Sequence, residues 1–336
     1  MNTNLVEPSV GWRPNGGRPG RMVVFAVKLA VTILCFSYIG SRIDVNKARD
    51  AVRMVDFGWL FLAMLALVLH LPLVSLRWCN IVDALGPASA PVHRPRMLAI
   101  TAIAAFFGQL MPSVASEGLR AWMLVPLGPT WRRAFASVLI DRAVGVGVFA
   151  ILSLMILLAP SPLRASLPQA PILTAAFAAI TVCGLASLAM APFVAMILQR
   201  WRYTAWAADL VRATHDMMLK SSAGFRCGLI AAAIGLLAIT SVWFLARGIG
   251  FGITIVDAGV LFTVIFGSML IPISIAGWGI RELAVAGVLA SQGVPLERSV
   301  TFSVCFGLTL LAASLPGAIV WVMYSPLRPS KPAQPW

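Results

Sequence analysis

Long apolar runs, separated by short basic segments, dominate the chain. A helix needs about 20 consecutive apolar residues to cross the hydrocarbon core of a bilayer. Six runs reach or approach this length: 22–40, 57–76, 134–160, 172–198, 226–247 and 300–324. We expect each of them to form one transmembrane helix.

Two further apolar stretches, 97–111 and 257–271, are shorter and run into proline and glycine. Such residues break a helix, and the freed backbone groups must then be buried in protein or line a water-filled cavity. We therefore predict a broken or re-entrant helix pair at each stretch. The expected hinge residues are Gly108, Pro112 and Gly118 in the first pair and Pro272, Gly277 and Gly279 in the second.

The sequences at the two predicted breaks are similar. Residues 107–112 read FGQLMP and residues 266–272 read FGSMLIP, about half the chain length apart. Each half then holds three crossings and one broken pair, and an odd number of crossings inverts the second copy, as in many transporters. The expected division is a basic N-terminal tail (1–21), a first repeat (22–160), an inverted second repeat (172–324) and a Pro-rich C-terminal tail (325–336).

The composition agrees with a membrane protein. Hydrophobic residues make up 60% of the chain and charged residues only 11%, whereas soluble domains hold about 25% charged residues. This excludes an ordinary soluble enzyme, a secreted disulfide scaffold and a disordered protein. The five cysteines and three histidines form no CxxC or metal-ligand pattern, so we expect no metal site and no cofactor.

The charge is strongly basic, with 26 Lys and Arg against 12 Asp and Glu and a net charge of +14. Because the basic residues lie between apolar runs, they indicate cationic loops at a membrane rather than nucleic-acid binding. Placing both termini in the cytoplasm puts about twice as many basic residues inside as outside. We therefore expect a multi-pass protein of the cell (inner or plasma) membrane with cytoplasmic termini, although the basic 41–56 segment then lies outside.

A few charged residues fall within or beside the membrane segments. Ionisable groups there are costly and are functional candidates by default. Adjacent residues on a helix point about 100° apart, so neighbouring acids and bases need not pair with each other. Arginine forks suit phosphate, which predicts a lipid-headgroup site, although these charges could also merely neutralise one another. The candidate headgroup residues are Glu117, Arg120, Asp141, Arg142, Arg281 and Glu282.

Two other features have simpler interpretations. The pair Arg77-Trp78 follows the second apolar run and is typical of an anchor at the membrane interface. Asp257 opens its apolar stretch, where we expect it to cap or bound a helix.

These residues give the chain a resemblance to a known family. The elements concerned are Arg77-Trp78, Phe107 to Arg120, Asp141-Arg142 and Pro272 to Glu282. In them the chain resembles the lysylphosphatidylglycerol synthase transmembrane region family, often called flippase-like integral membrane proteins. The resemblance implies a membrane fold that moves polar lipids between leaflets, here without the soluble aminoacyl-transferase domain of the bifunctional members. Many members show a Gly-Gly-Asp-like run where this chain has Ser116-Glu117-Gly118.

The leading hypothesis is therefore a transporter of a phosphate-bearing or otherwise polar-headed lipid, with no catalytic residues. One alternative is a membrane-embedded glycosyltransferase that uses a polyprenyl-phosphate sugar, with Glu117, Asp141 or Glu282 as its base. Another is an accessory subunit that recruits a lipid-modifying enzyme through the basic 199–226 segment. The chain has no GxxxxGK[ST] motif, which argues against an ATPase, and its pattern indicates no oligomeric state.

Overall fold

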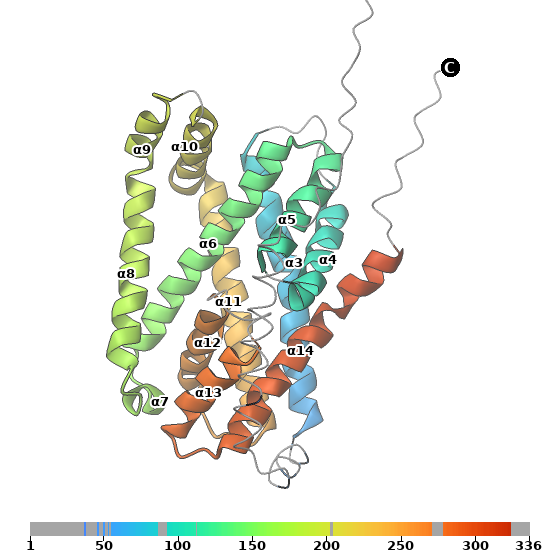
Figure 1. The fold of residues 1–336 in the computed structure, drawn as a ribbon, viewed down its shortest axis with the longest axis vertical. Helices are drawn as coiled ribbons and strands as arrows, with labels where there is room; N and C mark the ends of the chain where they lie inside the picture. The colour runs from blue at the N-terminus through green and yellow to red at the C-terminus, as the bar shows by residue number, and fades with distance from the viewer. Residues whose placement is uncertain are drawn as a thin grey trace, which may run out of the picture.

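A computed structural model describes residues 55–86, 93–111, 113–201, 204–270 and 278–323, together with isolated positions before 55. Within these ranges the chain is helical, with helices α3 to α14 and no strand. Figure 1 shows an elongated bundle whose long helices run between its upper and lower ends.

Within the described ranges, five helices are long and apolar enough to cross a membrane, which confirms the prediction of an all-α membrane protein. They are α3 (Phe57–Ala84), α6 (Trp131–Leu158), α8 (Ala170–Ala189), α11 (Ser222–Gly248) and α14 (Leu296–Met323). They correspond to five of the six predicted crossings, and the first, 22–40, lies outside the described residues.

Local sequence signals begin several of these helices. Asp56 caps α3 by accepting the Gly58 N–H at 2.8 Å, and Ser221 caps α11 by accepting the Ala223 N–H at 3.2 Å. Such caps satisfy backbone donors that the first helical turn leaves free.

The crossing predicted over 172–198 is wrong as one continuous helix. The structure ends α8 at Ala189 and begins a separate helix, α9 (Ala191–Leu198), after a turn at Met190. Pro192 explains the break, because proline has no N–H to donate to the preceding turn and its ring clashes with that turn's carbonyl group.

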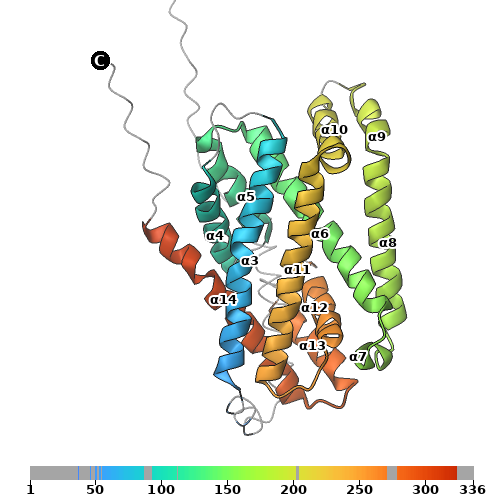
Figure 2. The same ribbon diagram turned by 180° about the vertical axis from the view of Figure 1, so that it is seen from behind.

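The two predicted broken segments are short helix pairs that enter the bundle from opposite ends. The first pair, α4 (Arg94–Leu110) and α5 (Ser113–Leu124), enters from the upper end in Figures 1 and 2. The second pair, α12 (Ile255–Leu270) and α13 (Ile280–Ala290), enters from the lower end. This arrangement is what an inverted repeat requires, while the repeat itself and the proposed domain limits stay predictions.

The remaining elements lie near the ends of the bundle: η1 (Val125–Leu127), α7 (Pro162–Ala165) and α10 (Ala205–Lys220). The C-terminal end of α3, the start of α6, and α9 and α10 all lie at the upper end of Figure 1. These are segments that the basic-residue pattern assigns to one side of the membrane. The identity of that side as cytoplasmic stays a prediction.

Close backbone packing holds the centre of the bundle. Helices α3 and α11 run side by side in Figure 2, and the Ser241 hydroxyl donates to the Ala63 carbonyl at 3.0 Å across them. Helix α14 crosses α4 at Gly317, where an added Cβ would overlap the Ala102 carbonyl. Small residues permit such contact between membrane helices.

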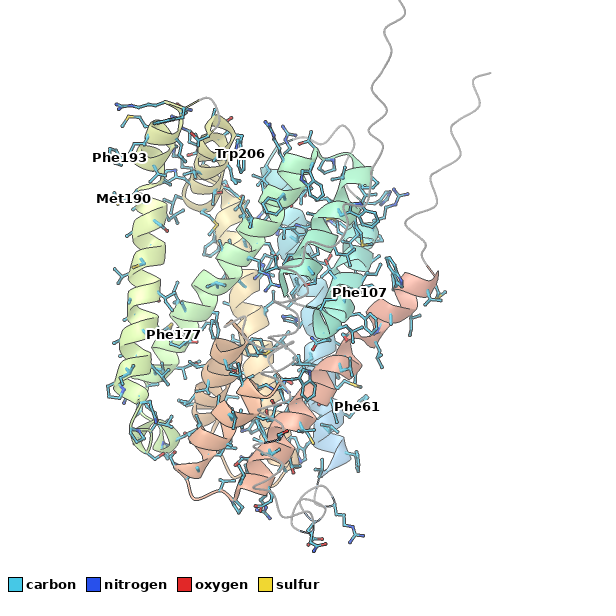
Figure 3. All side chains as sticks on the ribbon, viewed as in Figure 1. Phe61, Phe107, Phe177, Met190, Phe193 and Trp206 are labelled. Atoms are coloured by element: carbon cyan, nitrogen blue, oxygen red, sulfur yellow. The ribbon has the colours of Figure 1, made fainter. Side chains whose placement is uncertain are left out.

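Helix α8 is peripheral by comparison. Phe177 packs edge-on against Phe149 of α6 with ring centroids 5.5 Å apart, and Figure 3 shows it on the side of α8 that faces α6. Met190 and Phe193 lie at the outer edge of the bundle and are about half exposed. An apolar exposed face of this kind suits contact with lipid tails.

We predict that Gly317→Ala destabilises the bundle, because its Cβ would force α4 and α14 apart. The melting temperature of the purified protein in detergent should fall by several degrees. Gly147→Ala in α6 is the matched control, since a Cβ there meets nothing within 4 Å; alanine's helix propensity should leave its melting temperature equal or slightly higher. Equal melting temperatures for both variants would contradict the predicted contact.

Candidate functional site

Five charged side chains of the first half form one connected cluster. They come from three helices: Arg77 from α3, Glu117 and Arg120 from α5, and Asp141 and Arg142 from α6. Four of the five were candidates from the sequence, and the structure brings those four together.

Asp141 is the centre of this cluster. It is 1% exposed, and its two carboxylate oxygens accept from different helices. Oδ1 accepts from Arg77 Nε at 2.7 Å and Oδ2 from Arg120 Nη1 at 3.0 Å. One carboxylate therefore compensates two buried guanidinium groups, which do not deprotonate in proteins.

Glu117 links the cluster to its more exposed edge. Its Oε2 accepts from Arg120 Nη1 at 3.1 Å. Its Oε1 accepts from Arg142 Nε at 2.6 Å and also from Arg142 Nη2. The neighbours Asp141 and Arg142 thus have different partners, in agreement with the expectation that adjacent helical residues need not pair.

Arg120 has an unused hydrogen-bonding edge. One face of its guanidinium lies 4.3 Å from the ring centroid of Trp78, and the Trp78 indole N–H donates to Ser137 Oγ at 3.1 Å. Arg120 is 5% exposed, yet among the described residues its Nε and Nη2 have no hydrogen-bond partner. The Thr101 hydroxyl is also buried without such a partner in this part of the chain.

Arg120 and Thr101 line a cavity of about 400 Å³ inside the bundle, a size typical of small-molecule sites. Polar groups gather on one part of its wall, where His70 and Gln109 join the charged cluster. The rest of the wall is apolar and includes Phe149, Phe262, Phe266 and Leu310. The cavity is therefore amphipathic, with cationic groups in one part and aromatic and aliphatic groups in the other.

The polar part of the cavity carries a net positive charge. Among the described lining residues, three arginines face two carboxylates, which leaves a formal excess of one positive charge. Across the described ranges, no group of three or more His, Cys, Asp or Glu side chains is arranged to hold a metal ion. The chemistry that these residues offer is anion binding by guanidinium groups.

The second-half candidates Arg281 and Glu282 form a separate, closed cluster. They are 1% and 0% exposed, and neither belongs to the described wall of the cavity. Arg281 Nη2 donates to Glu282 Oε1 at 2.6 Å, and Arg281 Nε donates to Ser303 Oγ at 3.2 Å. The expectation that this pair shares a headgroup site with Arg120 therefore finds no support in the geometry.

The start of α13 explains this closure. Glu282 Oε2 accepts the Gly279 N–H at 2.5 Å, as a capping glutamate does. The Trp278 ring lies 4.6 Å from the Arg281 guanidinium carbon and covers it. Gly279 has a φ of +88°, a conformation that favours glycine, so it does lie at the end of a break.

The other predicted hinges divide into two groups. Gly108 lies inside α4 near its end, where a Cβ would meet Ser116 Oγ at 3.4 Å. Gly118 lies within α5 with open space around it, so it is not at the break. Pro112, Pro272 and Gly277 lie outside the described residues.

Sequence reasoning missed the role of Arg77. The pair Arg77-Trp78 was interpreted as an interfacial anchor, but α3 continues to Ala84 and buries both residues. His70 also lines the cavity, seven residues before Arg77 and therefore on the same helix face. Asp257 behaves as expected of a cap, because it accepts from Thr254 Oγ1 at 2.8 Å and from the Leu163 N–H at 3.1 Å.

Comparison with known families identifies the one to which this sequence corresponds. Residues 25–317 match the family described as the lysylphosphatidylglycerol synthase TM region. The chain belongs to this family. The matched range contains both charged clusters and every described residue that lines the cavity. Membership implies a lipid-related function in a membrane. Neither the curated proteins nor the solved structures contain a match.

We predict that Asp141→Asn destabilises this family member strongly. Removing the shared carboxylate leaves Arg77 and Arg120 buried and mutually repelling, and breaking a buried ion pair costs about 3–5 kcal/mol. The melting temperature should fall markedly in detergent. Asp216→Asn is the control, since that carboxylate is exposed and pairs with Lys220 at the surface, and it should melt like the unchanged protein. An Asp141→Asn variant as stable as the control would contradict the bridging role.

Proposed function

We propose that this protein carries a phosphate-bearing polar lipid between the two leaflets of the cell membrane. The observation that supports this most strongly is the Nε–Nη2 edge of Arg120, which has no partner in the part of the chain that the structure describes and is buried in the wall of an amphipathic cavity. Buried polar groups in native proteins almost always have partners, so an exception asks for an explanation. The explanation that we propose is that the partner of this edge is a bound ligand and not a protein group.

A phosphate group fits this edge chemically. The Nε and Nη2 hydrogens of an arginine point in parallel and bind two oxygens of one phosphate or carboxylate. The excess positive charge of the cluster favours an anion over a neutral ligand. The Thr101 hydroxyl offers a further hydrogen bond on the same cavity wall.

The apolar part of the cavity suits the rest of a lipid. Phe149, Phe262 and Phe266 pack against one another, with the ring centroids of Phe262 and Phe266 4.6 Å apart. Such a surface can contact the part of an acyl chain that lies nearest to the lipid's glycerol backbone. The rest of the tail then stays in the bilayer. A soluble phosphate compound would leave these aromatic groups without a role.

The arrangement of the broken helices favours transport over catalysis. The helix pairs α4–α5 and α12–α13 enter from opposite ends, and residues of both pairs line the cavity. Transporters commonly place their substrate sites between such discontinuous helices. Both acids on the cavity wall, Glu117 and Asp141, are engaged by arginines, which disfavours either as the general base of a glycosyltransferase.

We place the protein in the cell membrane with both termini in the cytoplasm, because the more basic end of a membrane protein faces inward. It works without a cofactor and is not itself an enzyme. We expect its partner to be a lipid-modifying enzyme that makes or consumes the transported lipid.

The test is lipid movement in proteoliposomes that hold the purified protein and acyl-labelled phosphatidylglycerol or phosphatidylethanolamine. Fluorophore on the outer leaflet is reduced chemically, and the further loss of fluorescence reports movement from the inner leaflet. The protein should accelerate this loss for at least one lipid. No acceleration over protein-free liposomes for any lipid of the panel would overturn the proposal.

Arg120→Gln should reduce that rate by about tenfold or more. Hydrogen bonds to charged groups contribute about 1.5–3 kcal/mol, and about 1.4 kcal/mol corresponds to a factor of ten. Arg132→Gln, an exposed arginine at the start of α6, is the matched control and should retain the full rate. Equal rates for both variants, at equal amounts of folded protein, would contradict the role of Arg120.

A further inference from the structure

Glu117 occupies an unusual place for a residue in an anion site. Its carboxylate lies between two of the arginines that would attract the anion, with Oε2 on Arg120 and Oε1 on Arg142. Its side chain is 16% exposed and belongs to the cavity wall. A carboxylate in this position competes with an incoming anion for the same positive charges.

The two acids of the cluster contribute differently. Asp141 bridges Arg77 and Arg120, and both arginines are almost fully buried. Glu117 contacts only the Nη1 of Arg120 that Asp141 already engages. Its other oxygen engages Arg142, whose side chain is 52% exposed and needs no internal partner to remain charged. Asp141 is therefore required to bury the cluster, whereas Glu117 is not. The presence of Glu117 calls for a functional reason.

That reason lies in the charge of the site. With Glu117 the site carries one excess positive charge, and without it the site would carry two. A phosphodiester headgroup carries one negative charge and would neutralise the site. A phosphomonoester carries up to two, because its second pKa is about 6, and would leave one negative charge uncompensated in a region of low dielectric, which is costly.

We infer that Glu117 is a specificity-determining residue, which sets the site to accept lipids with a singly charged phosphodiester headgroup and to disfavour doubly charged phosphomonoester lipids. This rests on the proposed function, because it concerns the same cavity and the same ligand class. Arg120 provides the hydrogen bonds to the phosphate. Glu117 sets the net positive charge of the site and thereby the negative charge of the headgroup that the site can neutralise. The geometry keeps these roles apart, since Glu117 contacts Nη1 of Arg120 and leaves the Nε–Nη2 edge free.

The test compares two short-chain lipids that differ in this respect, dihexanoyl phosphatidylglycerol and dihexanoyl phosphatidate. Equilibrium binding to the purified full chain is measured at pH 8, where the phosphomonoester is doubly charged. The unchanged protein should bind phosphatidylglycerol more tightly. Glu117→Gln should raise the affinity for phosphatidate relative to phosphatidylglycerol by about tenfold or more. For each lipid, the affinity for Glu117→Gln is divided by the affinity for the unchanged protein. The effect of headgroup size is the same in both affinities and therefore cancels from this ratio.

Two further variants separate charge from shape and from folding. Glu117→Asp retains the charge and should retain the original preference, whereas a shift as large as that of Glu117→Gln would overturn the inference. Glu297→Gln makes the same chemical change at the start of α14, away from the cavity wall, and should leave both affinities unchanged.

The outcomes distinguish this inference from the proposed function. If the unchanged protein binds neither lipid, the phosphate site itself is refuted and the role of Glu117 with it. If it binds both lipids and Glu117→Gln leaves their affinity ratio unchanged, only the selective role of Glu117 is overturned. A Glu117→Gln protein that binds phosphatidylglycerol as before is folded, so its phosphatidate affinity remains a valid test.

Discussion

The structure of the candidate site depends on one carboxylate, that of Asp141. Two guanidinium groups from different helices approach it, and both are buried where an isolated charge would be very unfavourable. By accepting from Arg77 with one oxygen and from Arg120 with the other, Asp141 allows α3, α5 and α6 to meet around a charged interior. It also fixes Arg120 so that the Nε–Nη2 edge remains free and lies at the wall of the cavity.

The two halves of the chain use similar residues for different purposes. Each places an arginine against a tryptophan ring and beside a glutamate. In the second half, Ser303 and Glu282 accept hydrogen bonds from Nε and Nη2 of Arg281, and the cluster is almost fully buried. In the first half, Nε and Nη2 of Arg120 have no hydrogen-bond partner among the described residues, and a cavity lies beside them. Motif similarity alone therefore does not make two sites equivalent, because the neighbours in space decide which one can receive a ligand.

Sequence reasoning recovered the helices well because membrane burial imposes long apolar runs that are visible without any tertiary information. It also singled out four members of the charged cluster, since Glu117, Arg120, Asp141 and Arg142 are charges in apolar surroundings. It missed Arg77 because that residue stands at the end of an apolar run, where an interfacial arginine is common, and its partner lies 64 residues away. It did not separate Arg281 from this cluster, because the partners of a buried arginine include groups such as Ser303 that no local pattern reveals. The break before Pro192 could have been predicted from that proline.

The central claim is that the free edge of Arg120 holds the phosphate of a lipid. An experimental structure of the full chain in nanodiscs made of native lipid tests it most directly. The account predicts density for a phosphate group within hydrogen-bonding distance, about 3 Å, of Arg120 Nε and Nη2, continuing into an acyl chain beside Phe149 and Phe266. Lipid density only on the outer surface, with that edge of Arg120 paired to another side chain of the protein, would contradict it.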